Sequence, residues 1–334
     1  MRHYTSGKCR LLFVGDVMLG RLLNETLTRE SPQFPWGDVL PVFQQADRRV
    51  CNLECVMSDI GSPWSATPKV FHFRSDKKNL AVLKAAGIDA VSLANNHTLD
   101  FGYSALLDML HGLHAAGIAC SGAGSNIVTA TSPGLMKVQG LRIGLISFTD
   151  NQPEWEATPE RAGIFYMPVD VEDQRSAKLF ELVRYTRRHT DLLIVAAHWG
   201  GNWGYSPPLS HVEFGRALVR AGADVIFGHS AHVFRGIEIH RGRPIIYSAG
   251  DFIDDYAVDP LERNDQSFIF VLEMDKGLFH RLRLYPTVIR HFQARLAGID
   301  EAREIAARMV KLCDSFQTPA SWNPGERCLD IEIC

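Results

Sequence analysis

The chain has 334 residues, a formal net charge of −3 at pH 7, 46% hydrophobic residues and 22% charged residues. These values are typical of a globular protein that is long enough to bury a sizeable core, and they exclude fibrous and low-complexity chains. No block of Lys and Arg supplies the basic stripe that a nucleic-acid-binding protein needs. We therefore do not expect nucleic acid as a partner.

The start of the chain and its cysteines favour a cytoplasmic protein. The apolar stretch at residues 11–14 is too short for a signal peptide or a membrane anchor, and no later segment reaches spanning length. The seven cysteines are odd in number and irregularly spaced, which predicts free thiols in a reducing compartment. We expect a cytoplasmic location without a membrane anchor, and the sequence leaves the oligomeric state open.

Strand-length apolar runs alternate with helix-like patterns along the first two thirds of the chain. Strands are predicted at 10–14, 50–54, 90–94, 192–197 and 224–227, with a hairpin at 135–148 turned at 139–140. Helices are predicted at 36–46, at 76–86 with Ser75 as the N-cap, and at 104–116, 171–188 and 209–221.

The pattern changes after residue 236. Short strands are predicted at 236–239, 244–248, 267–273 and 278–285, followed by a helix at 300–313. Alternating strands and helices followed by antiparallel strands indicate an α/β sandwich whose sheets are covered by helices. Neither a repeat nor a linker divides the sequence, so we expect a single domain over residues 1–334.

Polar side chains follow five of the predicted strands. The carboxyl ends of strands in α/β sheets form the ligand crevice, so these distant segments are expected to converge. Their nitrogen and oxygen donors, without a thiolate, suit one or two divalent ions of manganese, iron or zinc, and a carboxylate can bridge two ions. A single histidine after a strand is more often a hydrogen-bonded core residue. The pooled residues are Asp16, Glu54, Asn96, His97, His198, His229 and His232.

Six short motifs occur in a characteristic order. They are GDVMLGR at 15–21, NLE at 52–54, ANNHTLDFG at 94–102, HWG at 198–200, GHSAH at 228–232 and YSAGDF at 247–252. With these motifs, the chain resembles the CapA family of capsule and poly-γ-glutamate biosynthesis proteins over about residues 10–290. That family is similar to the calcineurin-like metallophosphatases. The resemblance implies a four-layer αββα sandwich with mixed sheets and a two-metal site on the loops after the strands.

The resemblance also implies a role for each site residue. Asp16 and His232 would bind a first metal, Glu54 would bridge, and Asn96, His198 and His229 would bind a second metal. His97 would be a general acid held in position by Asp100. Arg21 is a candidate clamp for an anionic substrate, although a surface ion pair explains it equally well.

Two residues depart from the metallophosphatase pattern. Met18 stands where that pattern has a histidine, so the first metal would have only Asp16, Glu54 and His232 and its site is expected to be weak or empty. Glu54 replaces the usual bridging aspartate. Both departures question phosphatase chemistry more than family membership.

Three functions follow, in order of preference. The first is a metal-dependent hydrolase in which a divalent ion lowers the pKa of water, the resulting hydroxide attacks, and His97 donates a proton. Its substrate would be an anionic phosphoester or a glutamyl or peptide-like amide. Candidates to line its groove are Trp155, Trp199, Trp203 and Tyr205, although most aromatic residues lie in the core. The second is a metal-independent peptide epimerase that uses Asp and His as acid and base. The third is a non-catalytic accessory protein of γ-glutamyl polymer synthesis.

Overall fold

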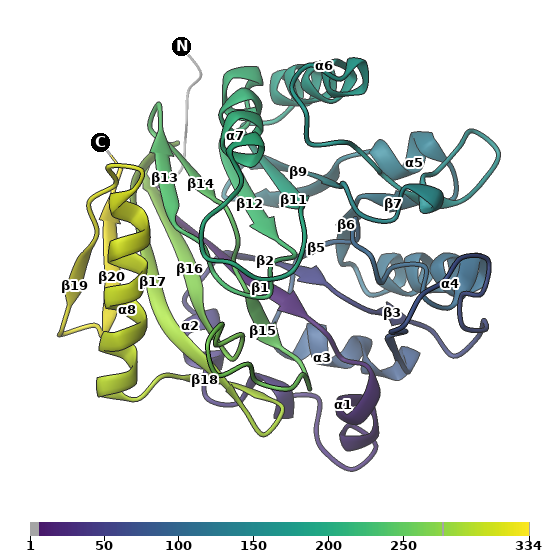
Figure 1. The fold of residues 1–334 in the computed structure, drawn as a ribbon, viewed down its shortest axis with the longest axis horizontal. Coiled ribbons are helices and arrows are strands. Elements are labelled where there is room, and N and C mark those ends of the chain that lie inside the picture. Colours follow the sequence, from purple (N-terminus) through teal and green to yellow (C-terminus); the bar gives the residue numbers. More distant parts are fainter. Residues whose placement is uncertain (1–6, 276, 334) are drawn as a thin grey trace.

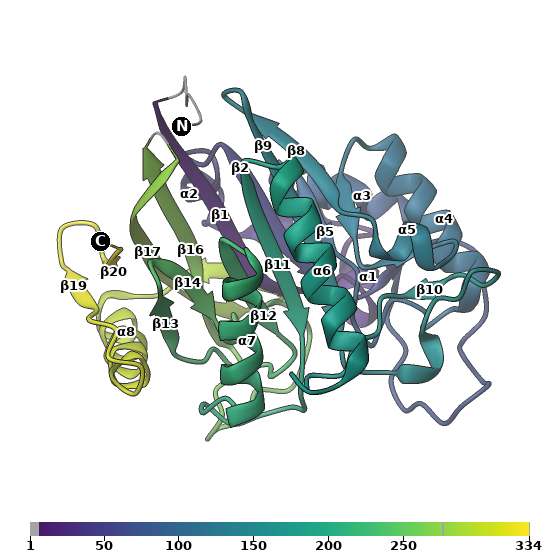
Figure 2. The same ribbon diagram turned by 90° about the horizontal axis from the view of Figure 1, so that it is seen from above.

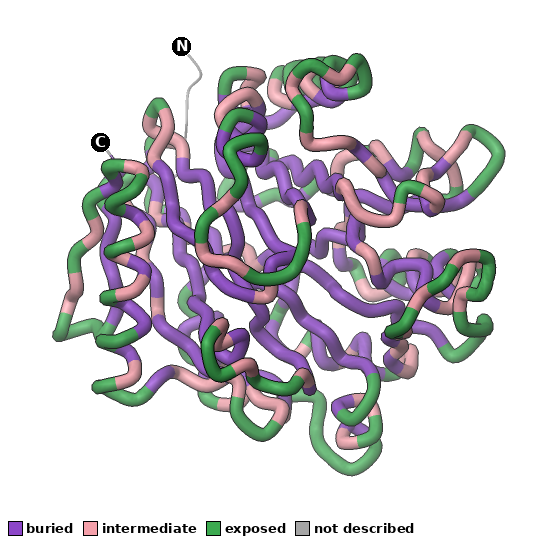
Figure 3. Tube along the Cα trace, in the orientation of Figure 1, coloured by how far each residue is buried: buried purple, intermediate pink, exposed green. Residues whose placement is uncertain are grey.

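Two β-sheets packed face to face form the centre of the molecule, and helices cover both outer surfaces (Figures 1 and 2). The computed structural model describes residues 7–275 and 277–333. The strands at the centre are buried along most of their length, and exposed residues concentrate in helices and loops (Figure 3). The expected mixed α/β class and the four-layer αββα arrangement are confirmed.

The larger sheet has 10 strands and mixes parallel and antiparallel pairs. Its order is β19 (Ser321–Asn323), β20 (Cys328–Glu332), β17 (Leu278–Arg290), β16 (Gln266–Asp275), β1 (Lys8–Val17), β2 (Arg48–Leu53), β5 (Ala90–Ser92) and β6 (Ala119–Ser121). In addition, β15 (Asp251–Ile253) pairs with β1, and β18 (Gln293–Leu296) pairs with β17.

The smaller sheet has six strands. Its order is β13 (Ile237–His240), β14 (Arg243–Ile246), β12 (Val225–His229), β11 (Leu192–His198), β9 (Leu141–Thr149) and β8 (Gly134–Val138). Two short pairs lie apart from the sheets, β10 (Gly163–Ile164) with β7 (Ala123–Gly124) and β3 (Val56–Met57) with β4 (Arg74–Ser75).

The helices connect these strands. They are α1 (Arg21–Thr26), α2 (Leu40–Phe43), α3 (Leu80–Ala85), α4 (Gly102–Ala115), α5 (Ile127–Thr131), α6 (Gln174–His189), α7 (Leu209–Ala221) and α8 (Ile299–Asp314). Three 3-10 turns are η1 (Phe34–Trp36), η2 (Lys77–Asn79) and η3 (Pro153–Trp155). Helices α6 and α7 lie over the smaller sheet (Figure 2).

Alternating side chains on β1 place one face in each of two cores. Leu11 and Phe13 pack between the sheets, where the Phe13 ring lies 5.5 Å from that of Phe227. Leu12 and Val14 point the other way, into the core formed with the helices behind the larger sheet. Because both faces are buried, β1 reads as an unbroken apolar run that leads directly into Asp16.

The helix predicted at 36–46 does not form as one element. Only η1 and the four-residue α2 form there, so this prediction is wrong. Gly37 interrupts the pattern at φ 47°, and a Cβ at this position would lie 2.3 Å from the Ala294 carbonyl oxygen. The apolar spacing of this segment serves packing against the sheet without requiring a continuous helix.

The helix predicted at 76–86 begins later than expected. Ser75 is not its N-cap, because Ser75 lies in β4 and its hydroxyl bonds to Asn24. The segment starts as η2 and becomes α-helical only at Leu80. Ser75 thus bonds to a residue of α1 in place of capping this helix.

The described cysteines are free thiols, as predicted. They are Cys9, Cys51, Cys55, Cys120, Cys313 and Cys328. Cys334 and the first six residues lie outside the described residues. Within the described part of the chain, none of the helices is both long enough and apolar enough to span a bilayer.

Gly15 allows β1 and the segment before β15 to approach closely. A Cβ on Gly15 would lie 1.8 Å from the carbonyl oxygen of Gly250, which accepts a hydrogen bond from the Asp16 N–H. We expect Gly15→Ala to lower the free energy of unfolding by at least about 1–3 kcal/mol, as measured by urea denaturation. Gly201→Ala is the control, since a Cβ there meets no atom within 4 Å. Equal stability of the two variants would contradict this packing argument.

Candidate functional site

The carboxyl ends of strands from both sheets meet at one place. In the larger sheet, Asp16 on β1 is paired with Asn52 on β2 and with Asp251 on β15. In the smaller sheet, His198 on β11 is paired with His229 on β12. Paired residues on neighbouring strands project from the same face of a sheet, so each pair enters the site side by side. The predicted convergence of distant strand ends therefore occurs.

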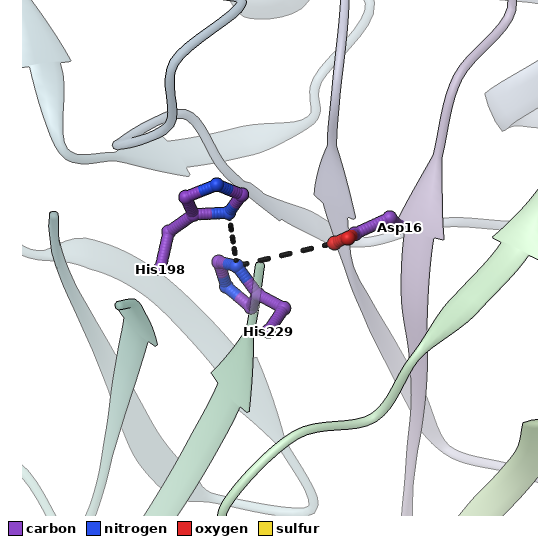
Figure 4. Close-up of side chains that lie close together, drawn as sticks. All are labelled: Asp16, His198 and His229. Atoms are coloured by element: carbon purple, nitrogen blue, oxygen red, sulfur yellow. Dashed lines mark hydrogen bonds and ion pairs between the residues drawn. The ribbon is translucent and has the colours of Figure 1, made fainter. Parts of the chain in front are cut away.

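Asp16, His198 and His229 form a cluster that we name the His198 cluster (Figure 4). The Nδ1 atoms of the two rings lie 2.8 Å apart, and His229 Nδ1 lies 3.9 Å from Asp16 Oδ1. All three residues are at most 2% exposed. Their ligand atoms lie within 4.8 Å of one another, which is close enough for one ion to contact all three.

Glu54 joins this cluster through Asn52. The Asn52 side-chain amide donates hydrogen bonds to Asp16 Oδ1, at 2.7 Å, and to Glu54 Oε2. Glu54 Oε2 lies 3.6 Å from His198 Nδ1. Asn95 donates in turn to Asn52 Oδ1 at 3.0 Å. Asn52 and Asn95 were not among the predicted site residues, although each lies in a motif beside a predicted ligand.

A second group contains Asp16, His232 and Asp251, and we name it the His232 cluster. His232 Nδ1 lies 2.9 Å from Asp251 Oδ1. His232 has a φ of 60°, and the turn from His229 directs both rings toward Asp16. Asp251 was missed as a site residue. The signal for it was a carboxylate that follows the strand predicted at 244–248.

His97 and Asp100 form a buried pair beside the two clusters. The His97 Nδ1 donates to Asp100 Oδ2 at 2.6 Å, and the ring stacks on Phe73 with centroids 3.9 Å apart. Asp100 also accepts from the Phe73 N–H at 2.6 Å and lies 3.2 Å from Lys69 Nζ. The carboxylate therefore orients the ring and leaves Nε2 for exchange with a substrate. Lys69 comes from a loop without a recognisable pattern, so no sequence signal pointed to it.

The side chains of Asn96 and Arg21 make different contacts near the site. The Asn96 side-chain oxygen is buried without a hydrogen-bond partner among the described residues, while its backbone carbonyl accepts from Lys69. The Arg21 guanidinium is paired with Asp255 at 3.4 Å and lies over the rings of Phe73 and Tyr256. Arg21 therefore stands near His97, and its role as a substrate clamp stays a prediction.

Burial controls the protonation of the site. Burial raises the pKa of Asp16 to about 6, and burial with the nearby Asp16 charge raises the pKa of Glu54 well above its usual range. Burial likewise raises the pKa of Asp251. Burial lowers the pKa of His97 to about 4 and that of His229 to about 3. The imidazoles are therefore neutral near pH 7, as metal ligands must be.

The residues present fit a divalent cation. Asp16 Oδ2 and His229 Nε2 are buried without a hydrogen-bond partner in the described chain, an arrangement that is costly unless a ligand satisfies them. Several buried carboxylates also lie close together with few cationic side chains beside them. A divalent ion supplies both the missing partner and the missing positive charge.

The aromatic residues expected to line a groove lie in different environments. Trp155 and Trp199 are 0% exposed and belong to the cores, so the prediction that they line a groove is wrong. Tyr205 is partly buried and bonds to Glu262 and Arg308. Trp203 is 39% exposed, and its ring lies 5.6 Å from that of His232. Among these four aromatics, Trp203 combines exposure with a contact to the site.

Comparison with known proteins gives a family and relatives. A family model described as "Bacterial capsule synthesis protein PGA_cap" matches residues 10–256. A "probable polyglutamine synthesis accessory protein" of Mycobacterium tuberculosis is 36% identical over 231 residues, which cover 67% of this chain and 60% of that protein. The "PGA biosynthesis protein CapA" of Bacillus subtilis is 28% identical over 257 residues, which cover 76% of this chain and 66% of that protein. The match thus spans less than two thirds of either relative.

A solved structure shares the fold. It is a hypothetical protein from Thermus thermophilus, with a TM-score of 0.50 and 14% identity over 83% of this chain and 98% of that chain. The family model covers all six motifs, from GDVMLGR at 15–21 to YSAGDF at 247–252. The resemblance stated from those motifs is confirmed, and the chain belongs to the bacterial capsule synthesis protein PGA_cap family.

Proposed function

We propose that this chain is a metal-dependent hydrolase that acts in the synthesis of a capsular or poly-glutamate polymer. The observation that carries the proposal is the buried group of carboxylates and neutral imidazoles in which Asp16 Oδ2 and His229 Nε2 have no partner among the described residues. Buried polar groups without partners lower the stability of the fold. A bound cation would satisfy them and would supply the charge needed for hydrolysis. The polymer is taken from the family description, which names capsule synthesis, and from the relative named a PGA biosynthesis protein, together with the resemblance to poly-γ-glutamate biosynthesis proteins.

The ligands proposed for the ions are residues that lie at or after the ends of strands of both sheets. A bound divalent ion supplies Lewis acidity and lowers the pKa of water at neutral pH. Asn52 holds Asp16 and Glu54 in fixed positions through its side-chain amide, which keeps both carboxylates directed at the same point. The proposed ligands are Asp16, Glu54, Asn96, His198, His229 and His232.

His97 is proposed to move the proton. Its Nδ1–H is held by Asp100, so Nε2 is the ring nitrogen that accepts a proton and then delivers it to the leaving group. The carboxylate stabilises the imidazolium formed between these two transfers. Stacking on Phe73 prevents the ring from rotating away from this geometry.

The proposed substrate is anionic and peptide-like, with a γ-glutamyl amide favoured over a phosphoester. Arg21 lies over the Phe73 ring that stacks on His97. Its guanidinium pairs with Asp255 and has further N–H donors for an anion. Trp203 lies beside His232 and offers an exposed aromatic surface. A chain of glutamyl units carries one free carboxylate per residue, which a guanidinium recognises through paired hydrogen bonds. The relative named a PGA biosynthesis protein supports a polymer-related substrate.

The test is a metal and hydrolysis assay on protein purified without chelator. We expect at least one divalent transition metal per chain, cleavage of a γ-glutamyl p-nitroanilide or of a poly-γ-glutamate oligomer, and loss of cleavage after chelation with recovery on adding manganese. Well under one metal per chain after incubation with manganese, iron or zinc would contradict the proposal. A protein that binds the oligomer and the metal without cleaving it would instead have a binding role.

A second candidate function is a peptide epimerase. The observation that favours it is that two separate imidazole–carboxylate pairs, His97 with Asp100 and His232 with Asp251, flank the same site. An epimerase needs an acid and a base on opposite faces of one carbon. This reaction predicts incorporation of solvent deuterium next to a carbonyl of a peptide, resistance to chelator, and no bond cleavage, all measurable by mass spectrometry.

A further inference from the structure

Asp251 lies where a further metal ligand is needed. Its strand β15 runs parallel to β1, and the register pairs Asp251 with Asp16. The pairing is reinforced by the Asp16 N–H, which donates to the Gly250 carbonyl oxygen at 3.0 Å, and by the Met18 N–H, which donates to the Ile253 carbonyl oxygen at 2.8 Å. The two carboxylates therefore enter the site next to each other.

Met18 does not contribute a donor to this site. Its side chain is fully buried in the core between the larger sheet and the helices. Its sulfur accepts the Gly20 N–H at 3.0 Å. The ligand missing at position 18 is therefore not replaced by a neighbour on β1, and the neighbouring strand β15 brings a carboxylate next to Asp16.

The Asp251 carboxylate lies among buried polar side chains. Asp254 and Asn264 lie beside it, and all three residues are buried. His232 lies 2.9 Å from one Asp251 oxygen and 3.2 Å from the other. The contact between His232 and Asp251 orients both side chains before an ion binds. Independently, Asp16 Oδ2 is buried without a hydrogen-bond partner among the described residues, which indicates that a cation binds between Asp16 and Asp251.

The two clusters differ in their donors. The His232 cluster offers two carboxylates and one imidazole, whereas the His198 cluster offers one carboxylate and two imidazoles. Oxygen-rich sites suit manganese and other hard ions, while imidazole-rich sites suit zinc and other borderline ions. A site built from the two clusters is therefore chemically asymmetric.

We propose that Asp251 is a ligand of the first ion, together with Asp16 and His232, and that this site selects manganese over zinc more strongly than the His198 cluster does. This inference rests on the metal site of the proposed function and identifies its missing ligand. It also makes the first site complete, in contrast to the weak or empty site expected from the sequence.

The test uses the whole chain, stripped of metal and then titrated with Mn²⁺, with Zn²⁺ and with equal amounts of both. Bound Mn²⁺ is measured by electron paramagnetic resonance and total metal by mass spectrometry. In the wild-type chain we expect two ions and, in the mixture, a larger share of Mn²⁺ at one site than at the other. Asp251→Ala is expected to weaken Mn²⁺ binding at one site by at least about 10- to 100-fold while the other site keeps Zn²⁺.

His198→Ala is the reciprocal variant and is expected to lose the zinc-preferring site while keeping Mn²⁺. Asp251→Asn keeps the shape of the side chain and is expected to weaken Mn²⁺ binding in the same direction, so that the test remains valid if Asp251→Ala does not fold. Circular dichroism reports the folding of each variant.

The outcomes separate the inference from the proposed function. Two ions in the wild-type chain and unchanged binding in both Asp251 variants would overturn the inference and leave the proposed function standing. Selective loss of Mn²⁺ in a chain that cleaves no γ-glutamyl substrate would support the inference and contradict the hydrolase. Simultaneous loss of both ions in Asp251→Asn would overturn the separate selectivity of the two clusters.

Discussion

Replacing His97 with alanine is expected to lower kcat by about 10²- to 10⁴-fold, which is the usual contribution of a positioned acid or base. The ring donates to Asp100 through Nδ1 and stacks on Phe73, so Nε2 is the nitrogen left for the substrate. His97 belongs to neither of the two clusters that contain Asp16. We therefore expect the metal content of His97→Ala to match that of the wild-type chain.

Steady-state kinetics on the γ-glutamyl substrate and elemental analysis of the same preparation measure the two effects. Asp100→Asn is the matched control, because it keeps the size of the side chain but weakens its support of the imidazolium. Its kcat is expected to fall less than that of His97→Ala, with a changed pH profile. If His97→Ala loses metal in parallel with activity, the ring is a ligand and its assignment as the proton carrier is wrong.

His229→Ala is expected to remove one bound ion and, with it, most of the hydrolytic activity. His229 is fully buried, its Nδ1 lies 2.8 Å from that of His198, and its Nε2 has no hydrogen-bond partner among the described residues. Because burial lowers the pKa of this ring to about 3, the ring is neutral and ready to bind a cation near pH 7. Isothermal titration with Zn²⁺ measures the loss.

Asp16→Ala provides the comparison for this variant. Asp16 contributes to both the His198 cluster and the His232 cluster, so its removal is expected to weaken the binding of both ions. His211→Ala is the control for the loss of a buried imidazole outside the clusters, since His211 stacks on Trp199 in the core. Equal zinc binding by His229→Ala, His211→Ala and the wild-type chain would remove His229 from the ligand set.

Local patterns were sufficient for much of the fold. The strands β1 and β11 are apolar runs because both of their faces are buried. Such runs can be recognised from the sequence alone. The hairpin of β8 and β9 turns at Gln139 and Gly140, both with positive φ, as the sequence predicted. The helix predicted at 36–46 is wrong, and Gly37 within it packs against the Ala294 carbonyl of a segment far along the chain, a contact that local spacing does not reveal.

The sequence by itself determined which chemical groups follow the strands and therefore the type of site. A carboxylate or imidazole placed directly after a buried strand enters the crevice whichever order the strands take, so Asp16, His198 and His229 were predictable. Only the tertiary structure decided which groups touch. Asp251 reaches Asp16 because β15 pairs with β1 although the two strands are far apart in the sequence, and Lys69 reaches Asp100 from a loop. Strand order and loop paths depend on packing between distant segments, and local periodicity contains no record of that packing.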